Sequence, residues 1–404
     1  FSAGVSEVKT RGLKRTVTIE ADKRTPRDNF YHCLKNSAHQ FHNKSCGKHY
    51  ILAGYPWFKC RARDMFIALP GLTLALNEEF EFISAMNTAA EAIRDFIKGR
   101  PTKCQVYEME RPDVFLWAIW AIQQYAKYCG RQKAWDQYGR LMMDIMDYLR
   151  HNRHVNFYLH GNGLVHINGR ESAETWMNST VDGVPVVPRT GYVVEINALW
   201  YNALKFVAEL SNECGKSDYS RRMEQIAQKV EASFPAVFVN EYGYLYDYVD
   251  GDYKDLSVRP NMVFAIAFDY SPLQQKQKKS VLDIVTKELL TPKGLRSLSP
   301  KSMGYNPNYV GPQRERDYAY HQGTAWPWLA GFYFEAYLKL YKRSGLSFIE
   351  RQMIGYEDEM VSHCIGSLPE LFDGNPPFKG RGAVSFAMNI AEILRTVRMI
   401  NDFE

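Results

Sequence analysis

Acidic residues occur in several loop-like stretches of this 404-residue sequence, and one of them stands between apolar neighbours. Glu370 lies in the run LPELFDG, so proline and leucine flank it in a predicted loop. A carboxylate between apolar residues is unlike one that is merely exposed to solvent. A partly desolvated carboxylate can act as a general base that activates a water molecule. Glu370 is therefore the strongest single candidate for a catalytic residue.

The predicted loop over 153–194 holds a second group of candidates. In chain order they are Glu174, Trp176, Asn178 and Arg189, and Glu195 opens the helix that follows. Charged groups beside a tryptophan can hold a ligand that is polar at its edges and apolar on its faces. We therefore expect this loop to face the same cavity as Glu370.

Trp57, Arg63 and Asp64 converge at the start of the predicted helix 64–77. An aspartate at a helix start can cap the helix, which is worth about 1 kcal/mol and needs no ligand. The arginine and tryptophan beside it favour a binding site. Asp113 opens the next hydrophobic helix, and there capping explains the aspartate at least as well as binding does.

The run YHQGTAWPW contains His321, Trp326 and Trp328. Aromatic residues make up 14% of the chain, and many of them fall in predicted loops. Sugar rings stack their C–H faces on such side chains, so this distribution favours a glycan-binding cleft, although burial in the core is the alternative. His321, at the head of a predicted helix, is expected to hydrogen-bond a sugar.

One constellation has the residue types of a metal site, namely His39, His42, Cys46 and His49. Its spacing could be arranged into a tetrahedral zinc site. However, the four residues straddle the end of a predicted helix and a polar loop. We therefore expect no metal here and no cofactor elsewhere.

The elements that must position these residues are helices. An amphipathic stripe runs through Trp135, Tyr138, Leu141, Met142, Ile145, Met146 and Leu149. The same periodicity predicts about twelve helices along the chain. Their ranges are 28–42, 64–77, 79–98, 113–129, 131–152, 195–212, 216–234, 259–270, 273–290, 321–343, 346–364 and 382–401.

Short and long connections alternate between these helices. The long ones, at 43–63, 99–112, 153–194, 235–258, 291–320 and 365–381, should all emerge at one end of the molecule. Long loops in compact domains usually carry function. The helix 113–129 is apolar nearly all round, as expected of a helix buried on every side.

This alternation predicts an (α/α)₆ barrel over 28–404, with six inner helices inside six outer ones and a crater of long loops at one end. An α-solenoid would show a repeat of about 30–45 residues, and none is visible. Residues 1–27 read as a linker or an extension. Short hairpin strands are expected at 163–168 and 244–249.

Composition narrows the class of partner. The net charge is +5 without a Lys/Arg-rich run, which argues against nucleic acid, and no 18-residue apolar run favours a membrane span. Seven scattered cysteines favour a reducing, cytoplasmic compartment. The first residue is Phe1, which is consistent with a processed or truncated chain that lacks an N-terminal domain.

Five runs together resemble a known family. AGYPWFKCRARDMFIALPGL, ETWMN, VPRTGYVVEINALWYNAL, YHQGTAWPW and LPELFDG resemble, in this order and spacing, the C-terminal glucosidase domain of glycogen-debranching enzymes. The likeness covers roughly 28–401. It implies an (α/α)₆ fold and an inverting amylo-α-1,6-glucosidase that acts on glycogen or another branched α-glucan. It also implies that Arg63 and Asp64 grip the terminal glucose and that Glu370 is the catalytic base.

The chain departs from the family at one position. The family's Thr-Trp-Met-Asp stretch supplies the general acid, and Asn178 stands there in this chain. A carboxamide does not protonate a leaving alkoxide. Three explanations stay open: Glu174 or Asp182 takes the role, the protein binds glycans without cleaving them, or the chain carries an Asp-to-Asn change.

Other activities remain compatible with the same site. A glucoamylase-type or trehalase-type α-glucosidase shares the fold, and a catalytically silent glycan-binding protein is the alternative from a different class. The α-1,4, α-1,6 and α-1,1 linkages present the same terminal glucose. The sequence therefore leaves the linkage specificity open.

Overall fold

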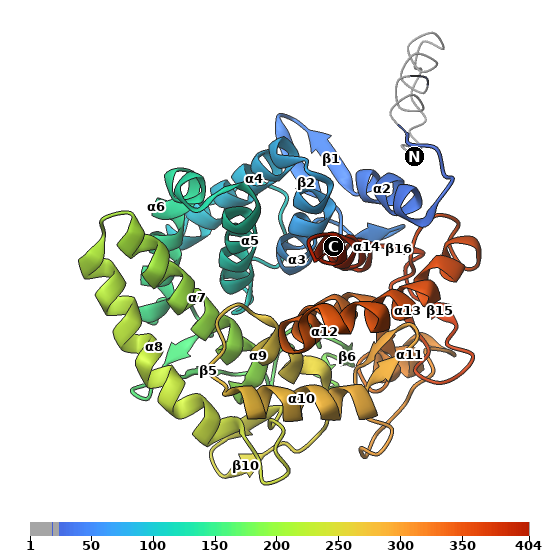
Figure 1. Cartoon of the computed structure of the whole chain (residues 1–404). Helices are drawn as coiled ribbons and strands as arrows, with labels where there is room; N and C mark the ends of the chain where they lie inside the picture. Colours follow the sequence, from blue (N-terminus) through green and yellow to red (C-terminus); the bar gives the residue numbers. More distant parts are fainter. Residues whose placement is uncertain (1–17, 19–23, 404) are drawn as a thin grey trace.

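The computed structural model describes residue 18 and residues 24–403, so most of the expected extension over 1–27 lies outside the described residues. Helices form two concentric rings (Figure 1). The inner ring consists of α3 (Ala62–Leu72), α5 (Val114–Cys129), α7 (Val194–Glu213), α9 (Phe264–Ala267), α12 (Pro327–Tyr341) and α14 (Ala387–Asn401). The outer ring consists of α2 (Phe30–Gln40), α4 (Glu79–Ile97), α6 (Arg131–Arg150), α8 (Ser217–Phe238), α10 (Gln275–Glu288) and α13 (Leu346–Glu357). This arrangement confirms the predicted (α/α)₆ barrel.

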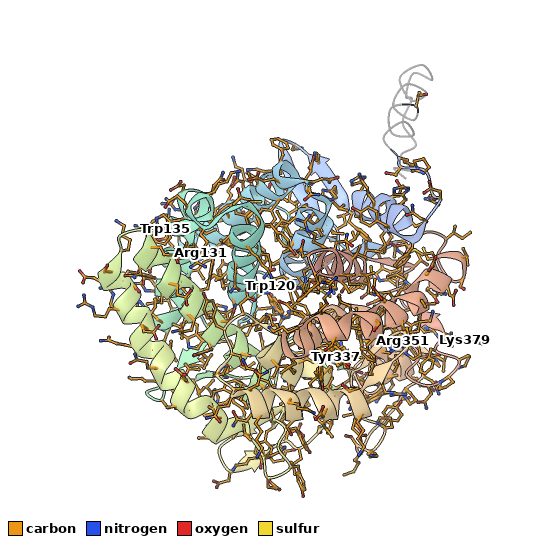
Figure 2. All side chains as sticks on the ribbon, in the orientation of Figure 1. Trp120, Arg131, Trp135, Tyr337, Arg351 and Lys379 are labelled. Atoms are coloured by element: carbon orange, nitrogen blue, oxygen red, sulfur yellow. The ribbon has the colours of Figure 1, made fainter. Side chains whose placement is uncertain are left out.

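Burial explains which helices are inside. In α5 every residue from Val114 to Ala126 is buried, whereas α6 buries only the stripe expected from its sequence. Trp120 of α5 lies near the centre of the ring, and Arg131 and Trp135 of α6 lie at its periphery (Figure 2). An apolar surface all round therefore places a helix in the inner ring, and a single stripe places it in the outer ring.

The ring closes where the last inner helix meets the first. Gly71 of α3 lies directly against the backbone of Ala391 in α14, and a Cβ atom at Gly71 would collide with the Ala391 carbonyl group. Glycine is therefore required for the close approach of these two helices. Among the described residues, no helix is long and apolar enough to span a bilayer.

Several predicted helices begin or end elsewhere; among them, the helix predicted over 346–364 ends at Glu357. The segment 259–270 forms only a 3₁₀ turn, η2 (Pro260–Val263), followed by the single turn of α9. The segments expected to open α12 and α14 instead contribute the strands β13 (Ala325–Trp326) and β16 (Ser385–Phe386). Pairing with loops distant in sequence overrides the helical preference there. An unexpected helix, α11 (Gln313–Ala319), forms in the fifth long loop.

The long loops also build two five-stranded sheets. One has the order β10-β9-β8-β5-β4, and the other has the order β11-β12-β13-β14-β15. The first contains β4 (Tyr158–Leu159), β5 (Val165–Ile167), β8 (Gly191–Val193), β9 (Tyr248–Asp250) and β10 (Tyr253–Lys254). The second contains β11 (Leu290–Thr291), β12 (Gly294–Arg296), β13, β14 (Leu371–Phe372) and β15 (Gly380–Arg381).

The predicted strands at 163–168 and 244–249 overlap β5 and β9. Both join the first sheet, in which β8 lies between them. The second sheet was not predicted. Three smaller antiparallel pairs complete the loops: β1 (His42–Ser45) with β2 (Lys48–Ile51), β3 (Gly54–Tyr55) with β16, and β6 (Thr180–Val181) with β7 (Val184–Pro185).

Candidate active site

A crater of about 990 Å³ opens among the long loops. Every long loop except the one between α8 and η2 contributes to its lining. A narrower pocket of about 30 Å³ continues from it toward the inner helices, and the two cavities share Phe58, Arg61, Asn178, Tyr320 and Glu370. A concave site of this size that converges on a few polar groups is typical of ligand binding.

Glu370 lies at the junction of the crater and the narrow pocket, directly before β14. The hydroxyl group of Tyr320 donates a hydrogen bond to Oε1, and the backbone N–H of Ala383 donates one to Oε2 at 2.8 Å. Burial raises the pKa of Glu370 to about 7, and these two hydrogen bonds oppose the rise. A carboxylate with a pKa near neutrality is suited to accept a proton from water.

Gly382 makes room for this carboxylate. Its φ of +71° lies in the left-handed region, and a Cβ atom there would collide with Oε2 of Glu370. Glycine thus serves both the turn conformation and the close approach of the backbone. The turn brings the N–H of Ala383 into hydrogen-bonding distance of Glu370.

Asp64 lines the narrow pocket from the first turn of α3. Within the described residues its carboxylate has no hydrogen-bond partner, and burial raises its pKa to about 6. Neither Asp64 nor Asp113 caps its helix through the side chain. Asp64 therefore presents free acceptor atoms to a ligand.

Arg63 also lines the narrow pocket, but its guanidinium group is hydrogen-bonded to other residues of the protein. The Nε and Nη2 atoms donate to the carboxylate of Asp113 at 2.7 and 2.9 Å, and Nη2 also donates to the carbonyl oxygen of Glu174 at 3.0 Å. Trp117 donates to the same Asp113 carboxylate at 3.2 Å. Asp113 does not line either cavity, so it positions Arg63 and, through Arg63, the third long loop.

An aromatic wall closes the pocket. Trp176 packs edge to face against His321, Trp326 and Trp328, with ring centroids 5.2, 5.6 and 5.3 Å away. All except Trp328 line the narrow pocket. His321 is buried, and burial holds its pKa well below the usual value, so the ring is neutral. Its Nδ1 atom has no hydrogen-bond partner among the described residues.

Trp57 lies at the rim of the crater, and 60% of its surface is exposed. An exposed indole in a cavity wall offers a flat apolar face to a ring-shaped ligand.

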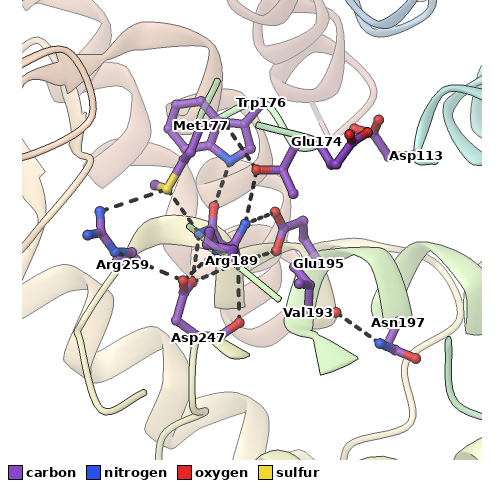
Figure 3. Close-up of polar contacts among 12 residues, drawn as sticks. Asp113, Glu174, Trp176, Met177, Arg189, Val193, Glu195, Asn197, Asp247 and Arg259 are labelled. Carbon is purple, nitrogen blue, oxygen red and sulfur yellow. Dashed lines mark hydrogen bonds and ion pairs between the residues drawn. The ribbon is translucent and has the colours of Figure 1, made fainter. Parts of the chain in front are cut away.

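Arg189 and Glu195 are buried and line neither cavity. Figure 3 shows them paired with each other, below Trp176 in this view. The guanidinium group of Arg189 binds the carboxylates of Glu195 and Asp247, at 2.6 Å from Nη2 to Glu195 Oε2 and 2.6 Å from Nε to Asp247 Oδ2. Asp247 in turn accepts from Asn261, and Asn261 accepts from Trp176. The prediction that Arg189 and Glu195 face the cleft was wrong. A fully buried charge needs a partner of opposite charge, and these two residues form a buried ion pair with each other.

Asn178 faces both the crater and the narrow pocket. The two carboxylates considered as substitutes do not line either cavity. Glu174 is held at 3.3 Å from Arg111, and Asp182, whose side chain is 70% exposed, pairs with Arg314 at 2.5 Å. Asn178 is therefore the only one of these three residues that faces the same pocket as Glu370.

Sequence reasoning missed Tyr320, Arg61 and Asp247. Tyr320 directly precedes His321 in the run YHQGTAWPW, so its position beside a candidate residue could have identified it. Its partner Glu370 lies 50 residues further along the chain, and no local rule predicts that contact. Arg61 lines both cavities, and Asp247 carries no local signal beyond its aromatic neighbours.

Comparisons with solved structures agree with the barrel. A GH63 mannosylglycerate hydrolase from Thermus thermophilus superposes with a TM-score of 0.61 at 12% identity and covers 90% of this chain and 99% of that chain. An uncharacterized conserved protein from the same organism gives a TM-score of 0.62 at 14% identity, with the same coverage. At these identities the likeness concerns the fold alone.

Sequence comparison is more specific. The glycogen debranching enzyme of Saccharomyces cerevisiae (strain ATCC 204508 / S288c) is 28% identical over an alignment of 219 residues, and the match covers 43% of this chain and 14% of that enzyme. The chain therefore matches only a small part of this relative. The profile of the family described as amylo-alpha-1,6-glucosidase matches residues 35–395, nearly the whole barrel. The chain belongs to the amylo-alpha-1,6-glucosidase family of glycoside hydrolases.

Proposed function

We propose that the terminal glucose of a branched α-glucan binds where the crater meets the narrow pocket and that Glu370 is the base of an inverting amylo-α-1,6-glucosidase site. The observation that carries the proposal is that Glu370 and Asn178 line one pocket. In this chain Asn178 occupies the position of the general acid. The site therefore holds the sugar but hydrolyses it slowly.

The chemistry follows from the two positions. Glu370 accepts a proton from a water molecule, the water oxygen attacks C1 of the glucose, and the C1–O bond to the leaving sugar breaks. The leaving oxygen carries negative charge unless an acid protonates it. An aspartic acid could do so, whereas the amide of Asn178 cannot, so the step stalls at departure of the leaving group.

The pocket walls support recognition of a sugar. The carboxylate of Asp64 is free to accept hydrogen bonds from hydroxyl groups, and neutral His321 has an unused ring nitrogen. Trp176 and Trp326 supply apolar surface beside these polar groups. At the crater rim, Trp57 can stack on the next sugar of the chain.

Asn178 also favours a second candidate function, a glycan-binding protein without activity. An α-glucosidase of the glucoamylase or trehalase type remains an alternative within the enzyme class, because these enzymes bind the same terminal glucose. Panose, maltotriose and trehalose separate the linkages in a single glucose-release assay.

We propose the cytoplasm as the compartment. Support comes from the seven cysteines, all of which are free thiols. Free thiols are stable in a reducing compartment.

Calorimetric titration with isomaltose tests the binding proposal. At a pH well above the pKa of Asp64, which burial raises to about 6, the chain is expected to bind the disaccharide. The Asp64→Ala variant is expected to bind it at least about tenfold more weakly, because hydrogen bonds to a charged group are worth about 1.5–3 kcal/mol.

Asp144→Ala, in the outer helix α6, is the matched control and should bind isomaltose like the parent chain. Failure of the parent chain to bind isomaltose, or unchanged affinity in Asp64→Ala, would count against the junction of the crater and the narrow pocket as the glucose site.

A further inference from the structure

Two histidines and a glutamate meet away from the crater. His42 begins β1 and His49 lies in β2, and the Nδ1 atom of His42 is 2.9 Å from the Nε2 atom of His49. Glu81, in the first turn of α4, brings its Oε2 atom to 3.5 Å from Nδ1 of His49. One ring nitrogen of each histidine and one oxygen of Glu81 lie within 4.8 Å of one another.

The cluster is enclosed and its hydrogen bonding is incomplete. His49 is only 2% exposed. The atoms His42 Nε2, His49 Nδ1 and Glu81 Oε2 are buried without a hydrogen-bond partner among the described residues. Buried polar atoms are nearly always satisfied, so three unsatisfied atoms in one cluster indicate a missing partner. Neither histidine lines the crater or the narrow pocket.

We propose that His42, His49 and Glu81 bind a divalent transition-metal ion, with Zn²⁺ as the best fit. Two imidazole nitrogens and one carboxylate are a common ligand set for zinc, and water completes the tetrahedron. The site differs from the constellation considered in the sequence. His39 bonds to Glu78 at 2.8 Å, and Cys46 is exposed.

Small movements would complete the coordination. Zn–N bonds of about 2.0–2.1 Å at tetrahedral angles place two ligand nitrogens about 3.3 Å apart. The unsatisfied atoms His49 Nδ1 and Glu81 Oε2, 3.5 Å apart, are already close to such a spacing. A ring nitrogen of His42 lies within 4.8 Å of the ligand atoms of the other two residues, so the His42 ring must move closer to complete the set. The ion would link the β1–β2 hairpin to α4.

The protonation state also suits a metal. Burial lowers the pKa of His42 and of His49 to about 4, so both rings are neutral at physiological pH and their lone pairs are available. The charged neighbour that opposes a cation is Lys44, whose Nζ atom lies 2.7 Å from Oε1 of Glu81. The positive charge of Lys44 therefore weakens the binding of a cation, but its hydrogen bond leaves the Oε2 atom of Glu81 free.

The test is calorimetric titration of the chelator-treated full chain with ZnCl₂, together with the visible spectrum after addition of CoCl₂. One ion per chain is expected, with a tetrahedral Co²⁺ absorption band and a higher melting temperature in Zn²⁺. His42→Gln and Glu81→Gln should each weaken binding at least about tenfold. His39→Gln, which changes the neighbouring half-buried histidine, should bind like the parent.

Lys44→Met keeps all three ligands and removes the opposing charge, so it should bind Zn²⁺ more tightly than the parent. This variant preserves the test if a ligand substitution impairs folding. Absence of binding at micromolar Zn²⁺, equal loss in His39→Gln, or unchanged affinity in Glu81→Gln and Lys44→Met would each overturn the metal site. These outcomes do not depend on glycosidase activity.

Discussion

The Asn178→Asp variant is expected to hydrolyse panose about 10²–10⁴-fold faster than the parent chain, because general acid catalysis of leaving-group departure is worth about that much. The new carboxyl group would face the pocket that already contains Glu370 and Asp64. Burial and the two neighbouring carboxylates should raise its pKa toward neutrality, so part of the population stays protonated at working pH. Glucose release from panose measures the gain.

Asn308→Asp is the matched control. Asn308 is exposed in the fifth long loop and does not line either cavity, so the same chemical change there should leave the rate unchanged. Rapid panose hydrolysis by the parent chain would contradict the account and would point to Glu174 as the acid. A neutral or harmful effect of Asn178→Asp would point the same way, since a second carboxylate would disturb the first one's ionisation.

Glu370→Gln, made in the Asn178→Asp background, is expected to lower panose turnover by a factor of at least about 10³. Glutamine has nearly the same volume and can still accept the hydrogen bond from Ala383, so the fold and isomaltose binding should persist. Steady-state kinetics and the isomaltose titration together separate lost chemistry from lost structure. Turnover like that of the background variant would exclude Glu370 as the base.

The pH dependence gives the same residue a second readout. Burial raises the pKa of Glu370 to about 7, and the base works only when ionised. In the Asn178→Asp background, the acidic limb of the kcat/KM profile should therefore fall as the pH drops through that pKa, whereas loss of the proton from the introduced aspartic acid sets the alkaline limb. A profile that stays flat down to pH values near the ordinary glutamate pKa of about 4.3 would contradict the assignment.

The barrel was predictable because the burial of each helix determines how its apolar residues are spaced along the sequence. The all-apolar surface of α5 and the single stripe of α6 placed each helix in the correct ring. The alternation of loop lengths then brought Trp57, Asp64 and Glu370 to one end. Asn178 was identified through the family motif, and its place in the pocket followed from the same alternation.

Contacts between distant loops were beyond the sequence. The sequence does not distinguish a charged residue that faces a ligand from one that pairs with a buried partner. The position of Arg189 was therefore predicted wrongly, because its partner Asp247 is 58 residues away in the chain. The second sheet joins two-residue and three-residue strands from different loops, which are too short to show a period. The pairing of His49 with Glu81 likewise depends on how the hairpin packs on α4.

Hydrolysis of α-D-glucosyl fluoride, followed by proton NMR, tests the central claim most directly. Fluoride departs with little help from an acid, so Asn178 should not block the reaction, whereas the attacking water still needs Glu370. Water attacks C1 from the face opposite the fluorine, its proton passes to Glu370, and the C1–F bond breaks. The parent chain is expected to release β-glucose first, and the Glu370→Gln variant is expected to be inactive. Initial release of α-glucose, or equal rates for the two proteins, would contradict an inverting site built on Glu370.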